Sequence, residues 1–355
     1  MTSIKDILAG ANKQYKRQVG YIGANKLPTD RLPTGIFQFD LATGGGFVVG
    51  RVNLVYGPES SMKSTLCLKA VASAQKKWPN KVAVFVDIEG HFDNTWAKRM
   101  GVDCERLAYV APTSSEEMID VVEQLMYAED VSVIVIDSLA AMVTTAELES
   151  SSEKAVVGNA SLAVNKFYRK STRALLVMEG RGTPVTLLLV NQTRSKIGVM
   201  YGDPETMPGG VAFKFASYLT VRVYGKDEFD KTLSDDLPAY KKVSVIVKKW
   251  KQPIASRNSE MMIALMNIPA FGLKIGDSYD WNTVLGYLKS LGMLAKSKEG
   301  WDFVDTGSGE IVCNFKTQDE MKARMYVDPE FAELVKNAII VAVLDGDNLI
   351  PPEDP

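Results

Sequence analysis

The chain has 355 residues, of which 46% are hydrophobic and 24% are charged, an ordinary globular composition that excludes whole-chain disorder. At about 150 residues per domain, this length suggests two domains, or one large domain with appendages. The formal net charge is -2, from 41 Lys and Arg against 43 Asp and Glu. That balance excludes a protein that binds polyanions through bulk charge alone, but it permits a local basic groove.

The composition also argues against secreted, zinc-binding and membrane-spanning proteins. The 3 cysteines are scattered and form no CxxC pair, so no disulfide framework is expected. A single histidine, His91, leaves no zinc ligand set. The N-terminus lacks a secretory signal pattern, and no apolar run reaches the roughly 18 residues that span a bilayer. We therefore expect a cytoplasmic protein without a membrane partner.

The chain begins with a predicted amphipathic helix. Its apolar positions recur at helical spacing: Ile4, Ile7, Leu8, Ala11 and Tyr15. A stretch rich in Gly, Pro and Asn follows at 20–35, as is typical of a linker. The helix either packs on its own domain or forms an arm that docks on a neighbouring subunit. We assign 1–31 as an N-terminal oligomerisation helix and linker.

The middle of the chain alternates short apolar runs with helix-length segments. The runs are rich in β-branched residues and almost continuously apolar, as expected of parallel strands buried on both faces. They are 52–56, 82–86, 131–136 and 185–190. Helix-length segments lie between them, for example at 64–77 and 115–128. This repetition predicts an α/β core over 32–279, with a mostly parallel twisted sheet and flanking helices.

Later segments differ from this repetition. Three runs without a helix between them are predicted as antiparallel strands at one edge of the sheet: 218–224, 242–247 and 261–266. A small α+β domain is expected over 280–344, with a helix at 281–291, a hairpin of 301–304 and 311–315, and a final helix at 328–344. The last residues, 345–355, hold four acids and no bases, which predicts a disordered acidic tail.

A predicted phosphate-binding loop follows the first core strand and opens a helix. In such a loop, backbone N–H groups and the positive end of the helix face an anion. The loop consists of Gly57, Pro58, Glu59, Ser60, Ser61, Met62, Lys63, Ser64 and Thr65. Lys63 is placed to reach the β- and γ-phosphates of a nucleotide, and the Ser64 hydroxyl to bind Mg²⁺. Where the pattern asks for Gly the chain has Met62, which restricts φ where the loop curls.

Acidic side chains end two of the buried strands. Asp137 follows the run 131–136, at the position where a carboxylate orients Mg²⁺ in phosphoryl transfer. Asp87 and Glu89 end another strand, and a glutamate there is placed to activate water as a general base. Each acid alone is equally a helix cap or a surface charge. Together with the loop, at the carboxyl edge of a parallel sheet, they predict one site.

These motifs occur in the order found in the RecA-family recombinases, which the chain resembles most strongly over 32–247. The motifs are 32–35, 57–65, 87–89, 133–138 and 191–192. The segment 196–206, continuing to 209–210 and 214–215, looks like the second DNA-binding loop of bacterial RecA. The degenerate position Met62 is similar to that in the UvsX recombinases of T4-like phages, for which the cytoplasm of a bacterial host is the expected location.

The resemblance implies roles for the residues around the nucleotide. Glu89 looks like the catalytic base, and Gln192 like the sensor that links the γ-phosphate to the DNA-binding loop. Trp96 corresponds to a residue that stacks on adenine, with Asp93 near the amino group of the base. Core packing remains an alternative for Trp96, because Trp is mostly buried in proteins.

The expected DNA contacts lie in two places. In the glycine-rich loop, basic side chains meet phosphates and apolar ones stack on bases, which suits a single strand of any sequence. Its candidate residues are Arg194, Lys196, Ile197, Gly198, Met200, Tyr201, Gly209 and Gly210. A second loop, 144–158, precedes a helix whose basic face carries Lys166, Arg169 and Arg173. Most basic helix faces are simply solvated, so only the resemblance implies that this face contacts DNA.

The resemblance implies a DNA-dependent ATPase that uses ATP and Mg²⁺. It would form a helical filament on single-stranded DNA and exchange strands with a homologous duplex in recombination, repair and replication. Lys248 and Lys249 would reach a neighbour's nucleotide across the filament interface, although a solvated strand end is an equal alternative. Single-strand-binding and loader proteins are expected partners. A ring helicase, and a passive filament-forming DNA-binding protein with weak ATPase, remain open.

Overall fold

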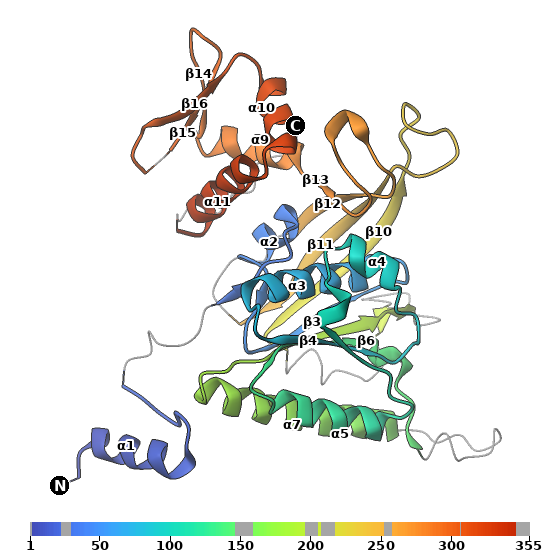
Figure 1. Cartoon of the computed structure of the whole chain (residues 1–355), viewed down its shortest axis with the longest axis vertical. Coiled ribbons are helices and arrows are strands. Elements are labelled where there is room, and N and C mark those ends of the chain that lie inside the picture. Colours follow the sequence, from blue (N-terminus) through green and yellow to red (C-terminus); the bar gives the residue numbers. More distant parts are fainter. Residues whose placement is uncertain are drawn as a thin grey trace. The chain divides into compact units, whose positions relative to one another are not determined.

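The computed structural model (Figure 1) describes residues 2–22, 30–145, 159–195, 205–206, 217–251, 258–305 and 307–345. The chain divides into two units that are each assembled from several segments. Unit 1 comprises 1–35, 46–224 and 246–256, and unit 2 comprises 36–45, 225–245 and 257–355. The four consecutive parts expected from the sequence remain a prediction. No helix among the described residues is long and apolar enough to cross a membrane.

A mostly parallel sheet forms the centre of unit 1, as the alternation of apolar runs and helices predicts. Its strands lie in the order β11-β10-β3-β7-β6-β4-β5, and every pairing from β10 to β5 is parallel. The strands are β3 (Val52–Gly57), β4 (Val82–Asp87), β5 (Leu107–Val110), β6 (Val131–Asp137), β7 (Thr186–Gln192), β10 (Leu219–Glu228) and β11 (Tyr240–Trp250). Two short pairs join β1 (Arg31–Leu32) with β2 (Phe47–Val48) and β8 (Arg194–Ser195) with β9 (Glu205–Thr206).

Helices cover both faces of this sheet. The helix α3 (Lys63–Lys77) lies on one face, while α5 (Ser115–Met126) and α7 (Asn159–Gly180) lie side by side on the other (Figure 1). Apolar side chains of α5, α7 and the central strands form one buried cluster. The short helices of unit 1 are α4 (Asn94–Arg99), η2 (Cys104–Arg106) and η3 (Leu139–Ala141). Because β4 and β6 contribute to this cluster, the loops that follow them start from fixed strand ends.

The predicted N-terminal helix is present as α1 (Ile4–Tyr15), and it buries none of its residues. A capping box between Ser3 and Asp6 starts it, and Lys16 ends it in a left-handed conformation with φ 49°. The following segment returns to α7, where the Gln18 N–H donates a 2.7 Å hydrogen bond to the Gly180 carbonyl. The apolar stripe of α1 thus stays exposed on its own chain.

Unit 2 contains the other end of β10 and β11, in the strand order β13-β12-β11-β10, and a second sheet in the order β14-β15-β16. The strands are β12 (Asn258–Ala264), β13 (Ser278–Tyr279), β14 (Leu294–Lys296), β15 (Trp301–Val304) and β16 (Ile311–Phe315). The helices are α2 (Phe37–Ala42), η4 (Pro269–Phe271), α9 (Trp281–Ser290), α10 (Gln318–Val327) and α11 (Pro329–Asp345). An apolar cluster joins α2, α9, α10 and α11 to the second sheet.

One strand prediction is wrong. The run 218–224 was expected to be antiparallel, but β10 pairs parallel with β3, with Leu219 opposite Asn53. The connection from Gln192 to Leu219 contains no predicted helix, yet it is long enough to return the chain to the same end of the sheet, which is all that a parallel pair requires. The helix α10 and the strands β5 and β14 were not predicted, because they are short or weakly patterned. Of the acidic tail, 346–355 lies outside the described residues.

Candidate nucleotide-binding and catalytic site

The 57–65 loop joins β3 to α3, in the strand-loop-helix order that a phosphate-binding loop needs. Its first residue must be glycine, since a Cβ on Gly57 would lie 2.0 Å from the carbonyl oxygen of Val223 on the neighbouring strand. The loop then curls through two left-handed residues, Ser60 with φ 55° and Met62 with φ 68°. Backbone N–H groups at the start of α3 therefore face the inside of the curl.

Met62 occupies the position where the pattern asks for glycine, and it adopts the conformation that glycine favours. It is the N-cap of α3 and makes no side-chain capping bond. A left-handed conformation costs a non-glycine residue roughly 1–2 kcal/mol. The Thr65 hydroxyl donates to the Met62 sulfur at 3.3 Å. The loop thus keeps its curl without the glycine, at a cost in backbone energy.

The Lys63 side chain lies inside the loop. Its Nζ donates to the Pro58 carbonyl at 2.5 Å and lies 3.5 Å from the Ser61 hydroxyl oxygen. The side chain is almost completely buried, and burial lowers the pKa of the ammonium group, with Asp137 the strongest opposing charge. A buried cation among the N–H groups of the loop suits a bound polyphosphate.

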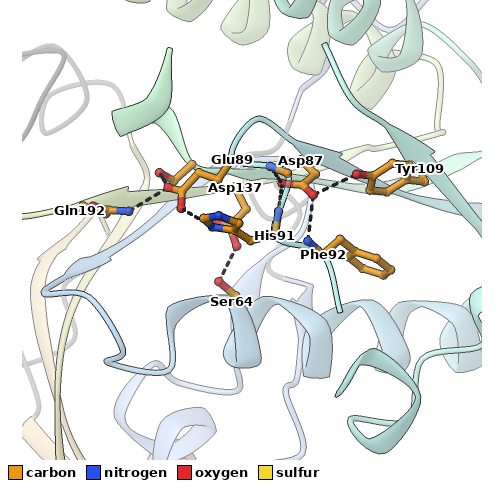
Figure 2. Close-up of polar contacts among 10 residues, drawn as sticks. Ser64, Asp87, Glu89, His91, Phe92, Tyr109, Asp137 and Gln192 are labelled. Atoms are coloured by element: carbon orange, nitrogen blue, oxygen red, sulfur yellow. Dashed lines mark hydrogen bonds and ion pairs between the residues drawn. The ribbon is translucent and has the colours of Figure 1, made fainter. Parts of the chain in front are cut away.

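Ser64 and Asp137 bring a hydroxyl and a carboxylate together at the head of α3. The Ser64 hydroxyl donates to Asp137 Oδ2 (Figure 2). Burial raises the pKa of Asp137 to about 6. Mg²⁺ prefers hard oxygen ligands and usually takes only one or two from the protein, with phosphates and water supplying the rest. The pair fits that ion, and the described residues contain no cluster of three or more His, Cys, Asp or Glu that would hold a metal alone.

Glu89 lies beside the adjacent carboxyl ends of β4, β6 and β7 (Figure 2). Its Oε1 accepts a 2.8 Å hydrogen bond from Gln192 Nε2 and another from the Ser138 hydroxyl. Its Oε2 lies 3.6 Å from Nδ1 of His91. The structure therefore brings together the two residues for which the sequence implied base and sensor roles, and it adds Ser138 and His91 to them.

Asp87 has a structural role, although its position at a strand end predicted that it belongs to the nucleotide site. Its carboxylate accepts hydrogen bonds from the backbone N–H groups of Gly90, His91 and Phe92 at 2.8, 3.3 and 2.9 Å. A fourth bond, of 3.0 Å, comes from the Tyr109 hydroxyl on β5. With its side chain buried and engaged in four hydrogen bonds, Asp87 shapes the loop that carries Glu89.

Trp96 and Asp93 lie at the start of α4. Asp93 Oδ1 accepts from the N–H groups of Thr95 and Trp96, so it caps the helix. The half-buried indole of Trp96 donates to the Thr65 hydroxyl at 3.1 Å, which places it beside the phosphate loop and outside the apolar core. An adenine contact for either residue remains a prediction.

The other predicted residues lie apart from this site or outside the described residues. Lys248 and Lys249 lie in β11 just before its last residue, and burial lowers the pKa of Lys249. Arg194 begins β8, two residues after Gln192. The remaining loop candidates lie outside the described residues: Lys196, Ile197, Gly198, Met200, Tyr201, Gly209 and Gly210. On α7, exposed Lys166, Arg169 and Arg173 share one face at helical spacing.

Two residues of the site, Tyr109 and Ser138, were not predicted. Ser138 follows Asp137 directly, so the prediction of Asp137 as a site residue was a weak indication that Ser138 lies there too. Tyr109 lies on a strand that the sequence did not predict, and nothing in its local pattern points to Asp87. His91 is the only histidine of the chain and follows Glu89 by two residues, but a lone histidine gave no ligand set.

The chain is similar in sequence to proteins of one family. A family model described as the RecA N-terminal domain matches residues 2–266. Protein RecA of Bacteroides thetaiotaomicron is 32% identical over 313 residues, covering 88% of this chain and 87% of the relative. Protein RecA of Thermus aquaticus is 38% identical over 239 residues, 67% of this chain and 68% of the relative. Protein RecA of Chlorobaculum parvum is 44% identical over 193 residues, 54% of this chain and 53% of the relative.

The matched region includes the phosphate loop, the Glu89 and Asp137 strand ends and the Gln192 strand. The fold, a mixed and mostly parallel α/β sheet with flanking helices, is that of the family. Members of this family are DNA-dependent ATPases that act in recombination and repair. Because the family model matches most of its length, the chain belongs to the RecA family.

Proposed function

We propose that the chain hydrolyses ATP with Mg²⁺ at the 57–65 loop and uses this cycle to form a filament on single-stranded DNA and exchange strands with a homologous duplex. The contact between Gln192 and Glu89 carries this proposal. It joins a carboxylate suited to activating water to the strand that leads directly into Arg194 and the glycine-rich loop.

Each group of the site has a defined part in this reaction. Lys63 and the loop N–H groups hold the phosphates, and the Ser64 hydroxyl with Asp137 holds the ion. When bound, Mg²⁺ neutralises charge on the β- and γ-phosphate oxygens. Glu89 follows β4 at the same carboxyl edge of the sheet as the 57–65 loop, and it accepts the proton of the attacking water.

Gln192 can bond either Glu89 or a γ-phosphate oxygen. Because β7 continues from Gln192 into β8, a switch between these partners would alter the start of the DNA-binding loop. Nucleotide state and DNA affinity would thereby be coupled in both directions. Lys166, Arg169 and Arg173 on α7 would add contacts to the DNA backbone, as charge on an exposed helix face permits.

Self-association is supported by α1. Its apolar side chains are exposed, with Ile4 at 65%, Ile7 at 58% and Tyr15 at 59%. A helix with such a stripe gains stability by burying it against another surface, and a second copy of the chain is the proposed occupant. Lys248 and Lys249 would then reach the neighbour's nucleotide.

The finer assignment is to the UvsX-type recombinases of T4-like phages, supported by Met62 at the glycine position. In that case the protein would act in the cytoplasm of a bacterial host, with single-strand-binding and loader proteins as partners. The family match itself is equally satisfied by a bacterial RecA.

Two assays test the proposal. ATP hydrolysis should be strongly stimulated by single-stranded DNA and lost in Lys63→Ala and Glu89→Gln. With ATP, the protein should also form joint molecules from a single strand and a homologous duplex. ATPase without joint molecules would favour a ring helicase, and DNA binding without stimulated hydrolysis would favour a passive filament.

A further inference from the structure

A groove of about 700 Å³ lies in unit 1 between the segment that ends α1 and the outer face of α7. The N-terminal segment contributes Tyr15 and Arg17 to its walls. The opposite wall comes from α7 and the residue just after it, and it includes Tyr168, Arg169, Arg173 and Arg181.

The charge of this groove has one sign. Its walls contain four arginines and no carboxylate, and none of the four forms an ion pair with any residue in the described part of the chain. By contrast Arg51, which also reaches α7, forms two hydrogen bonds with Glu179, at 2.7 and 3.0 Å. Glu179, the one acidic residue in the sequence of α7, is thus engaged by Arg51. Unpaired guanidinium groups around one groove repel one another unless an anion lies between them.

The groove is held in shape by specific contacts. The Gln18 N–H donates to the Gly180 carbonyl at 2.7 Å, and a Cβ on Gly180 would lie 2.7 Å from the Gln18 carbonyl oxygen. Within the segment, Asn12 Oδ1 accepts from the N–H groups of Val19 and Gly20. These contacts fix the position of Arg17, which is half-buried, against the end of α7.

The side chains match phosphate groups in series. A guanidinium group binds a phosphate through two parallel hydrogen bonds, and it is more weakly hydrated than an ammonium group. Arg169 and Arg173 are one helical turn apart and Arg181 lies two turns further, which spreads the charge over about 18 Å of the groove. A single small anion would leave most of these donors unused.

We propose that this groove binds the phosphate backbone of a DNA strand, through Arg17 and Arg181 together with the arginines of the α7 face. The proposal rests on the proposed DNA-binding role of α7 and extends that surface to the N-terminal segment. Free polyphosphates carry the same phosphate chemistry, so they are the competing ligand.

The test uses the full chain and a fluorescent oligo-dT over a series of salt concentrations. Neutralising one phosphate contact lowers the slope of log K against log salt by about 0.7 for a single strand. Arg17→Gln and Arg181→Gln should each lower it by about that amount and the double variant by about twice as much. Arg99→Gln, at an exposed arginine of α4, serves as the control and should leave the slope unchanged. An unchanged slope in both groove variants would overturn the proposal.

Two further measurements separate the alternatives. Arg17→Lys and Arg181→Lys keep the charge and should restore most of the slope, whereas a purely structural role would not be rescued. Pyrophosphate, at constant ionic strength, should not displace the oligonucleotide from the groove. If it binds the wild type but not the double variant while the DNA slope is the same in both, the DNA assignment is overturned. If wild type itself binds no DNA, the proposed function fails and not the groove alone.

Discussion

The hydroxyl of Tyr109 donates a 3.0 Å hydrogen bond to Asp87 Oδ2, and through that carboxylate it acts on the loop that carries Glu89. Asp87 also holds three consecutive backbone N–H groups, from Gly90 to Phe92. The ring of Phe92 packs between Phe85 and Tyr109, with centroids 5.0 and 5.5 Å away. An edge strand thereby sets the position of a proposed catalytic carboxylate that it does not touch (Figure 2).

Tyr109→Phe is expected to lower the kcat of ATP hydrolysis several-fold and to leave the KM for ATP nearly unchanged. The variant keeps the ring contact with Phe92 and removes only the bond to Asp87, so the loop loses one restraint while the phosphate site is unaffected. Steady-state kinetics with saturating DNA measure both constants. Tyr127→Phe, at the end of α5, is the control. A rise in KM without a fall in kcat would contradict positioning of Glu89 by Tyr109.

Met62→Gly is expected to be more stable than Met62→Ala by about 1 kcal/mol, because a left-handed residue without a Cβ is unstrained. Neither variant has the sulfur that accepts from Thr65, so their difference isolates the backbone effect. Denaturant unfolding of the two variants measures it. Equal stabilities would mean that the loop relaxes to another conformation when Met62 is replaced.

Gln192→Ala is expected to abolish most of the stimulation of ATP hydrolysis by DNA while reducing the DNA-free rate much less. The residue joins Glu89 to the strand that precedes the proposed DNA-binding loop, so its loss is expected to uncouple the two. Rates with and without oligo-dT measure the effect, with Gln124→Ala on α5 as the control. Equal loss of both rates would assign Gln192 to the chemistry alone.

The affinity for Mg²⁺ with ATP is expected to weaken as the pH falls through about 6, the raised pKa of Asp137, which is caused first by its burial. Above that pH the carboxylate is charged and can bind the ion, and below it a proton competes. In the metal-free protein the sign reverses. The native state binds the proton more tightly than the unfolded chain, whose carboxyl has the ordinary value of 3.8, so this group adds stability as the pH falls from 7 towards 4.

Magnesium titrations between pH 5 and 8, followed by protection against thermal unfolding in the presence of ATP, check this expectation. Asp137→Asn cannot titrate and should lose both the pH dependence and most of the magnesium effect. A pH dependence that persists in Asp137→Asn would assign it to another group.

Ile7→Glu is expected to impair self-association and to lower the unfolding temperature of the monomer only slightly. Ile7 is 58% exposed, so a charge there costs little in one chain and much more once the stripe is covered by another copy. Sedimentation with and without DNA measures assembly. Lys5→Glu, on the same helix, controls for the added charge, and equal effects of the two changes would argue against an apolar contact.

The sequence by itself determined the local parts of this protein. The helix α1 was predicted from its apolar spacing, and the bounds of β15 and β16 agree with the predicted ones. The loop between β3 and α3 was recognised from its residue order. These features depend on periodicities of 2.0 and 3.6 residues and on short spacings, which neighbouring residues specify without help from the rest of the chain. The family match confirmed the RecA-type resemblance that the motifs implied.

Only the tertiary structure decided which distant residues meet. Three contacts join segments whose local sequence patterns give no sign of the pairing. They are the parallel pairing of β10 with β3, the hydrogen bond from Tyr109 to Asp87, and the hydrogen bond from Gln18 to Gly180. The loop around Glu89 is shaped by an edge strand that has no clear signal of its own. Chain connectivity and packing select such contacts from many that local patterns allow, and that is why Tyr109 and the four-arginine groove emerged only from the fold.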